Sequence, residues 1–156
     1  MTTCVTVLGL GNLLLRDEGV GVRLLEAVRD SRPWPAEVRF VDGGVGGLNL
    51  LNVIEEARRL VVFDAADMGL PPGECRLLSP EQLAADSSEH RLSLHDVSFV
   101  ETLDLCAQFF RRPDVVQILA IQPKLLEYGR ELSEELRSAM PLIVKQGVEL
   151  VEQTPT

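Results

Sequence analysis

The sequence predicts an α/β fold, a three-layer α/β/α sandwich around a mostly parallel, five-stranded sheet. Short apolar runs alternate along the chain with longer segments of helical periodicity, which is typical of strands joined by crossover helices. The runs at 5–10, 60–63 and 115–121 are apolar at nearly every position. Strands covered by helices on both faces require this pattern, so these three runs are expected to form the buried part of a parallel sheet.

One domain, residues 1–156, is expected to account for the whole chain. Its 156 residues, 46% hydrophobic and 25% charged, have an ordinary globular composition and suffice for a full core. There is no internal repeat, linker or low-complexity segment. Cys4, Cys75 and Cys106 are odd in number and far apart, which argues against a disulfide framework or a cysteine-rich zinc site.

The net charge of −9 limits the classes of partner. Nucleic acids and anionic membranes both favour basic patches, so neither is an expected partner. A small ligand, a metal cation or a positively charged protein surface is compatible with this charge. No apolar run approaches the ~18–20 residues of a membrane span, and the first residues lack the features of a secretory signal. We therefore expect a cytoplasmic protein, and a monomer.

The first half of the chain contains three predicted strands and two predicted helices. Strands are expected at residues 5–10, 38–41 and 60–63, and helices at 18–29 and from residue 48 onward. Asp17 is expected to be the N-cap of the first helix, because its carboxylate can accept hydrogen bonds from free N–H groups there. The prolines at positions 33 and 35 end this helix.

The second half contributes an edge strand, a buried strand and two long helices. The expected order is a strand at 74–78, a loop at 80–89, a helix reaching residue 110, a strand at 115–121 and a final helix from 133 to 151. The strand at 74–78 is more polar than the others and is therefore placed near an edge. Ser133 is the expected cap of the last helix. Pro141 falls inside that helix and predicts a kink or a break.

Three side chains that can bind metal follow strands or strand-like segments. Glu18 starts the first helix, Asp64 follows the strand at 60–63, and His90 opens a helix after the polar loop at 80–89. Ligands bind at the carboxyl ends of strands in open α/β sheets, and two carboxylates with one imidazole suit a divalent metal. An alternative stays open for two of them: Glu18 also fits a helix N-terminus electrostatically, and a lone histidine such as His90 is more often structural.

Other catalytic signatures fit the sequence poorly. Gly9-Leu10-Gly11 resembles part of a dinucleotide-binding fingerprint, but Leu14 occupies the place of the third glycine. There is no GxSxG elbow, Walker A loop or HExxH helix. The glycine-rich segment 42–47 follows a predicted strand, and its backbone can approach a ligand closely or simply form a loop.

Residues 9–22 resemble the opening motif of the hydrogenase maturation proteases. These endopeptidases trim the C-terminus of the large subunit of [NiFe]-hydrogenases. Three further stretches agree with the family in order and character, so the resemblance covers roughly the whole chain. The four stretches read Gly9-Leu10-Gly11-Asn12-Leu13-Leu14-Leu15-Arg16-Asp17-Glu18-Gly19-Val20-Gly21-Val22, Val41-Asp42-Gly43-Gly44, Val62-Phe63-Asp64-Ala65 and Ser88-Glu89-His90-Arg91-Leu92-Ser93-Leu94-His95-Asp96-Val97.

The resemblance implies that Glu18, Asp64 and His90 are the family's metal-binding residues. His90 is preferred to His95 because it precedes the Leu-x-Leu spacing, as the family motif does. Hydrolysis needs an activated water and a stabilised oxyanion. A metal can supply both, or a carboxylate, Glu18 or Asp64, can act as the general base in an aspartyl-protease-like reaction. The sequence leaves open whether the metal is used to recognise the substrate or to catalyse its hydrolysis.

The implied partner is a hydrogenase large-subunit precursor that already carries nickel. The nickel is then presented by the substrate and is not held permanently, and the segment Asp42, Gly43 and Gly44 lies against the peptide. Two other classes of protein remain as alternatives: a non-catalytic nickel-binding maturation chaperone, and a nucleotide- or flavin-binding α/β module.

Overall fold

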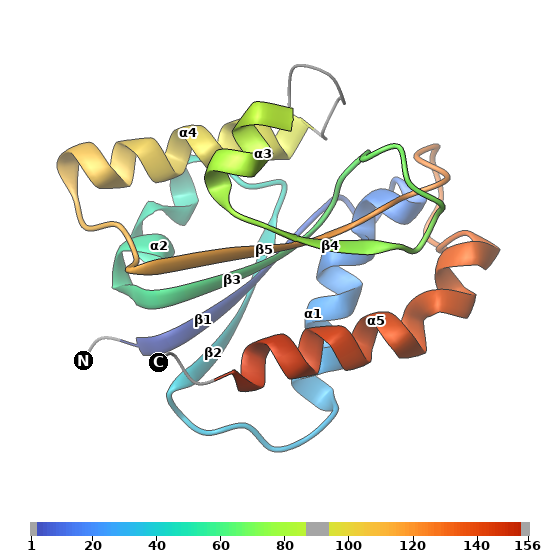
Figure 1. Ribbon diagram of the computed structural model, residues 1–156, viewed down its shortest axis with the longest axis horizontal. Coiled ribbons are helices and arrows are strands. Elements are labelled where there is room, and N and C mark those ends of the chain that lie inside the picture. Colours follow the sequence, from blue (N-terminus) through green and yellow to red (C-terminus); the bar gives the residue numbers. More distant parts are fainter. Residues whose placement is uncertain (1–2, 87–93, 154–156) are drawn as a thin grey trace.

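A single five-stranded sheet forms the centre of the computed structural model, which describes residues 3–86 and 94–153. The strand order is β2-β1-β3-β5-β4 (Figure 1). The strands β1, β2, β3 and β5 run parallel, whereas β4 lies at an edge and pairs antiparallel to β5. Their bounds are Thr3–Leu10 (β1), Val38–Gly44 (β2), Ala57–Ala65 (β3), Cys75–Leu78 (β4) and Val115–Ile121 (β5). The expected fold class and the edge position of the polar strand are confirmed.

Helices cover both faces of this sheet and complete the three layers (Figure 1). One face carries α1 and α5, which contact each other, and the other carries α2, α3 and α4. Their bounds are Val20–Asp30 (α1), Leu51–Glu56 (α2), Pro80–Asp86 (α3), Leu94–Phe109 (α4) and Glu134–Glu152 (α5), with short 3-10 turns at Arg16–Gly19 (η1) and Leu48–Leu50 (η2). Among the described residues, no helix is long and apolar enough to cross a membrane.

The central strand β3 contributes side chains to both hydrophobic cores. Val61 and Phe63 pack into the cluster beneath α1 and α5, whereas Leu60 and Val62 pack into the cluster on the opposite face. All four side chains are at most 1% exposed. Because successive side chains of a strand point to opposite faces, a continuous apolar run is what a strand between two helical layers needs.

Helix α3 replaces the first part of the loop that the sequence predicted at 80–89. Ser79 and Gln82 form a reciprocal cap: Gln82 N donates to Ser79 Oγ (3.2 Å), and Ser79 N donates to Gln82 Oε1 (2.8 Å). Proline is well tolerated at the first helical position, which Pro80 occupies. The Ser-x-x-Gln pattern is a helix-start signal. The loop prediction here was wrong because it followed the polar composition and missed this capping pattern. Residues 87–93 lie outside the described chain.

Helix α5 continues through Pro141, so the break that the sequence allowed is absent. Proline cannot donate the usual backbone hydrogen bond within a helix, which costs stability. The helix is held instead by its apolar face, where Leu136, Ile143 and Leu150 are buried against the sheet and α1. A Cβ on Gly147 would lie only 2.9 Å from Val28 Cγ2, so the two helices approach closely there. Packing outweighs the lost hydrogen bond.

Candidate functional site

The first two predicted site residues lie on neighbouring strands. Gly9 of β1 is paired in parallel with Phe63 of β3, so these two strands end side by side at the carboxyl edge of the sheet. The turn η1, which carries Glu18, follows β1 and contacts β3 directly. The carboxyl ends of β1 and β3 are therefore adjacent.

Gly21 allows the start of α1 to lie directly against both strand ends. A Cβ at this position would be 2.3 Å from the carbonyl oxygen of Leu10 and 2.3 Å from that of Phe63. Both contacts are with backbone, which cannot move aside cheaply. A glycine is therefore required at position 21 to keep the start of α1, and η1 directly before it, next to β3.

Both predicted carboxylates are almost fully buried. Glu18 is 6% exposed, and Asp64 is 1% exposed. Asp64 lies within β3, paired with Ala120 of β5, and not after the end of the strand as the sequence predicted. Carboxylates this deeply buried are costly unless they are paired or bind a cation. The carboxyl edge of the sheet thus holds two deeply buried acidic groups.

The third predicted ligand, His90, lies outside the described residues. Within residues 3–86 and 94–153, no group of three histidine, cysteine or acidic side chains is arranged to hold a metal ion. His95 belongs to α4. The complete ligand set Glu18, Asp64 and His90 therefore stays a prediction.

Asp17 has a different role from the one that the sequence suggested. The N-cap residue of α1 is Gly19, so the prediction that Asp17 caps this helix was wrong. The Asp17 carboxylate is fully buried and accepts hydrogen bonds from Lys124 N and Leu125 N (both 2.9 Å) and from Ser133 N and Ser133 Oγ (both 2.7 Å). Burial by itself raises the pKa of Asp17, but these hydrogen bonds outweigh it and hold the pKa below its usual value. Asp17 is a structural anion beside Glu18.

The segment predicted to contact a peptide is part of strand β2. Asp42, Gly43 and Gly44 belong to β2, which is longer than the predicted strand at 38–41. The exposed Asp42 accepts a hydrogen bond from Gly44 N (2.9 Å), and Gly44 has a φ of +53°. Gly11 N donates to Gly44 O (2.7 Å) and connects this segment to the loop after β1. The segment therefore borders the loop that leads to Glu18.

Exposed apolar side chains surround this edge of the sheet. They come from the connections that follow β1, β2 and β5, and four of them are more than half exposed: Leu14, Val45, Leu48 and Tyr128. Gly129 N donates to Leu14 O (2.9 Å), so the first and last of these connections are in contact. The full set, called the apolar rim, is Leu13, Leu14, Val45, Leu48, Leu126 and Tyr128.

These features define an α/β protein with buried acidic groups and exposed apolar side chains at the carboxyl edge of a mostly parallel sheet. Residues 22–150 match the family model described as hydrogenase maturation protease. The chain belongs to the hydrogenase maturation protease family, and it is a peptidase. The resemblance found in the sequence motifs is thereby confirmed.

Relatives and solved structures agree with this assignment. The hydrogenase expression/formation protein HoxM of Cupriavidus necator is 36% identical over 150 residues, which cover 96% of this chain and 74% of HoxM. The hydrogenase 2 maturation protease of Escherichia coli is 33% identical over 128 residues, covering 79% and 75% of the two chains. The solved structure of the hydrogenase maturating endopeptidase HybD from E. coli superposes with a TM-score of 0.83 at 25% identity, covering 95% of this chain and 91% of HybD.

Proposed function

We propose that this peptidase removes the C-terminal extension of a nickel-loaded [NiFe]-hydrogenase large-subunit precursor. The observation that carries the proposal is the burial of Glu18 and Asp64 on adjacent elements at the carboxyl edge, in a chain of this family. The names of the relatives, hydrogenase expression/formation protein and hydrogenase 2 maturation protease, support the same substrate class.

In this proposal Glu18, Asp64 and His90 engage the nickel of the substrate. Two carboxylates and an imidazole bind divalent metals, but without a thiolate they lack the soft ligands that favour zinc or copper(I). Such a set suits a metal that the precursor already holds through its own ligands, with open positions left for a partner. Engagement of the nickel then reports that the precursor has been loaded.

Peptide hydrolysis requires a base, a nucleophilic water and stabilisation of the oxyanion. Glu18 or Asp64, as the general base, takes a proton from the water that attacks the scissile carbonyl carbon. The tetrahedral intermediate collapses when the C–N bond breaks and the leaving amine receives a proton. The divalent metal of the substrate, when bound, can polarise the carbonyl and lower the pKa of water.

A polypeptide substrate fits the surface around the carboxylates. Asp42, Gly43 and Gly44 are proposed to lie against the peptide, and the apolar rim offers further contacts. A nucleotide or flavin would need a phosphate-binding glycine loop, which Leu14 interrupts. We propose that the protein acts in the cytoplasm as a monomer, with nickel supplied by the precursor.

The decisive experiment compares nickel-loaded and nickel-free precursor under identical conditions. Mass spectrometry of the precursor's C-terminal end should show cleavage of the loaded precursor only. Cleavage of both forms at the same rate would show that nickel is not the signal. Nickel-dependent binding without cleavage would instead support the maturation chaperone.

A second comparison tests the choice between the two histidines. His90→Ala should abolish processing of the loaded precursor, whereas His95→Ala should leave it largely intact. His95 is the matched control because it is the chain's second histidine and lies five residues away. The reverse result would move the ligand to His95.

A further inference from the structure

We propose that Asp17 and Gln122 are positioning residues that fasten both carboxylate-bearing segments to one connection of the fold. This connection, called the brace, is residues 122–133 between β5 and α5. Asp17 fastens η1, which carries Glu18, and Gln122 fastens the segment that follows Asp64. The kinetic part of the test rests on the proposed function.

Asp17 forms the first arm. Its carboxylate accepts four hydrogen bonds of 2.7–2.9 Å, all from the brace: two from Ser133 and one each from the backbone of Lys124 and Leu125. Asp17 N also donates to Leu125 O (2.9 Å), so backbone and side chain are both held. Because Glu18 is the next residue, the direction of its side chain depends on this attachment.

Arg16 adds contacts that keep η1 and the brace in register. Arg16 N donates to Gly129 O (2.9 Å), and Arg16 Nε donates to Glu131 O (3.0 Å). Gly129 has a φ of +152°, and a Cβ there would lie 2.9 Å from Arg16 Cγ. The brace therefore approaches η1 so closely that a side chain at position 129 would separate them.

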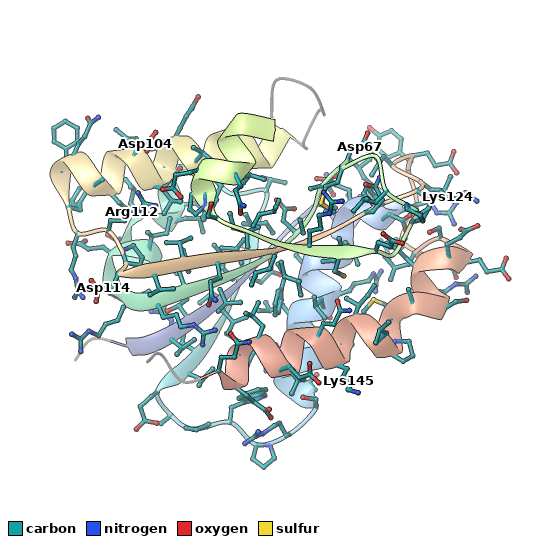
Figure 2. All side chains as sticks on the ribbon, viewed as in Figure 1. Asp67, Asp104, Arg112, Asp114, Lys124 and Lys145 are labelled. Atoms are coloured by element: carbon teal, nitrogen blue, oxygen red, sulfur yellow. The ribbon has the colours of Figure 1, made fainter. Side chains whose placement is uncertain are left out.

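Gln122 forms the second arm. Its Oε1 accepts from Met68 N (2.6 Å) and Leu70 N (3.3 Å), and its Nε2 donates to Asp67 Oδ1 (3.1 Å). Gln122 is 6% exposed, so these hydrogen bonds are shielded from water. Figure 2 shows Asp67 and Lys124, which the two arms hold, at the same end of the sheet. The segment after Asp64 is thus attached to the first residue of the brace.

Because both arms attach to the brace, they hold Glu18 and Asp64 in position relative to the same segment. Glu18 follows β1 and Asp64 belongs to β3, so their separation depends on loops as well as on the strand pairing. A misplacement of ~1 Å at a reacting centre can cost ~100-fold in rate. Loss of either arm should therefore lower kcat more than it changes KM, because the peptide-contacting segment Asp42, Gly43 and Gly44 lies on β2, outside the brace.

The first test is Asp17→Asn in the intact chain. The amide keeps the shape of the carboxylate but places an N–H₂ group against one of the N–H donors of the brace. We expect kcat for the loaded precursor to fall about tenfold or more, with KM changed less than about twofold. The matched control is Arg59→Met, which removes a buried charge at the far end of β3 and should leave kcat intact in the folded protein.

The second test reverses the polarity of the Gln122 arm. Gln122→Glu brings a carboxylate against Asp67 and should lower kcat, again with little change in KM. The double variant Gln122→Glu/Asp67→Asn restores a donor and an acceptor in exchanged positions, and should recover most of the lost kcat. A purely structural role for Gln122 would show no such recovery in kcat at equal stability.

Amide hydrogen exchange provides a readout that does not depend on activity. Asp17→Asn should accelerate exchange at residues 12–19 and 122–133 while the strands of the sheet stay protected. Unchanged exchange in these segments, or a kcat equal to that of Arg59→Met, would overturn the proposal that Asp17 positions Glu18 through the brace. If wild-type protein fails to process any precursor, the proposed function fails, whereas the exchange measurement still decides the inference.

Discussion

The two ends of helix α5 are held by buried charges of opposite sign. At its start, the Asp17 carboxylate accepts from the backbone N–H of Ser133, the N-cap residue. At its end, the Arg59 guanidinium donates to the carbonyl oxygens of Leu150 (2.5 Å) and Gln153 (2.9 Å). Free N–H groups begin a helix and free carbonyls end it, so each charge has the sign that the helix terminus favours.

The difference between these residues lies in their neighbours. Asp17 precedes Glu18 at the carboxyl edge of the sheet, whereas Arg59 is near the start of β3. Arg59 lies five positions before Asp64 along this strand, roughly 16 Å at ~3.3 Å per residue. The same type of helix anchor can therefore affect catalysis at one end of α5 and only stability at the other.

The largest effect is expected when the carboxylates themselves are changed. Glu18→Gln and Asp64→Asn should each lower processing of the loaded precursor by about 100-fold or more, because they remove a group that handles protons or metal. Both variants keep nearly the same size and should fold normally. Rates from mass spectrometry, with circular dichroism as the folding control, check this. Near wild-type rates for both would remove these residues from the reaction.

A large loss of stability without a loss of kcat is expected for Arg59→Met. The variant leaves buried carbonyl oxygens at the end of α5 without a donor, which costs about 1–3 kcal/mol. Urea unfolding should show the decrease. Lys145→Met, on the exposed side of the same helix, is the control and should change stability little. A fall in kcat for folded Arg59→Met would abolish the contrast between the two ends.

The pH dependence of stability tests whether the charge of Asp17 stabilises the fold. Because the folded state lowers the pKa of Asp17, its ionisation stabilises the protein above the unfolded pKa near 3.8. That contribution is lost as the pH falls through the lower, folded pKa. Asp17→Asn should therefore be less stable than wild type at pH 7, and the gap should shrink below about pH 4.

Asp30→Asn is the control for this acid titration. The pKa of Asp30 is lowered chiefly by the exposed Arg29, through a hydrogen bond that solvent screens. Its unfolding curves should nearly match wild type at both pH values. A constant gap between Asp17→Asn and wild type across this range would show that the Asp17 charge does not stabilise the fold.

The smallest effect is expected at the surface of the brace. Glu127→Gln removes the ion pair with Arg16, but the Glu127 side chain is 67% exposed. Exposed pairs contribute under about 1 kcal/mol, so thermal unfolding and kcat should both stay near wild type. A marked fall in kcat would mean that this surface pair, and not Asp17, fixes η1 to the brace.

The sequence by itself determined the buried strands and the edge that carries the acidic groups. Val61 and Phe63 alternate with Leu60 and Val62 in one run, and only a strand between two apolar layers needs that pattern. Helix α3 was also encoded locally by Ser79 and Gln82, although the polar composition there suggested a loop. Such features are visible in sequence because strand alternation and helix caps involve residues close together in the chain.

Only the tertiary structure decided the strand order and the role of Asp17. Its partners Lys124 and Ser133 lie 107 and 116 residues away, so no local pattern announces them. From the sequence, an aspartate just before a helix indicates a cap, because the nearest N–H groups are those of that helix. In the fold, the start of α5 brings other N–H groups to Asp17. Long-range packing, which a local pattern does not encode, therefore decided which N–H groups bind the Asp17 carboxylate.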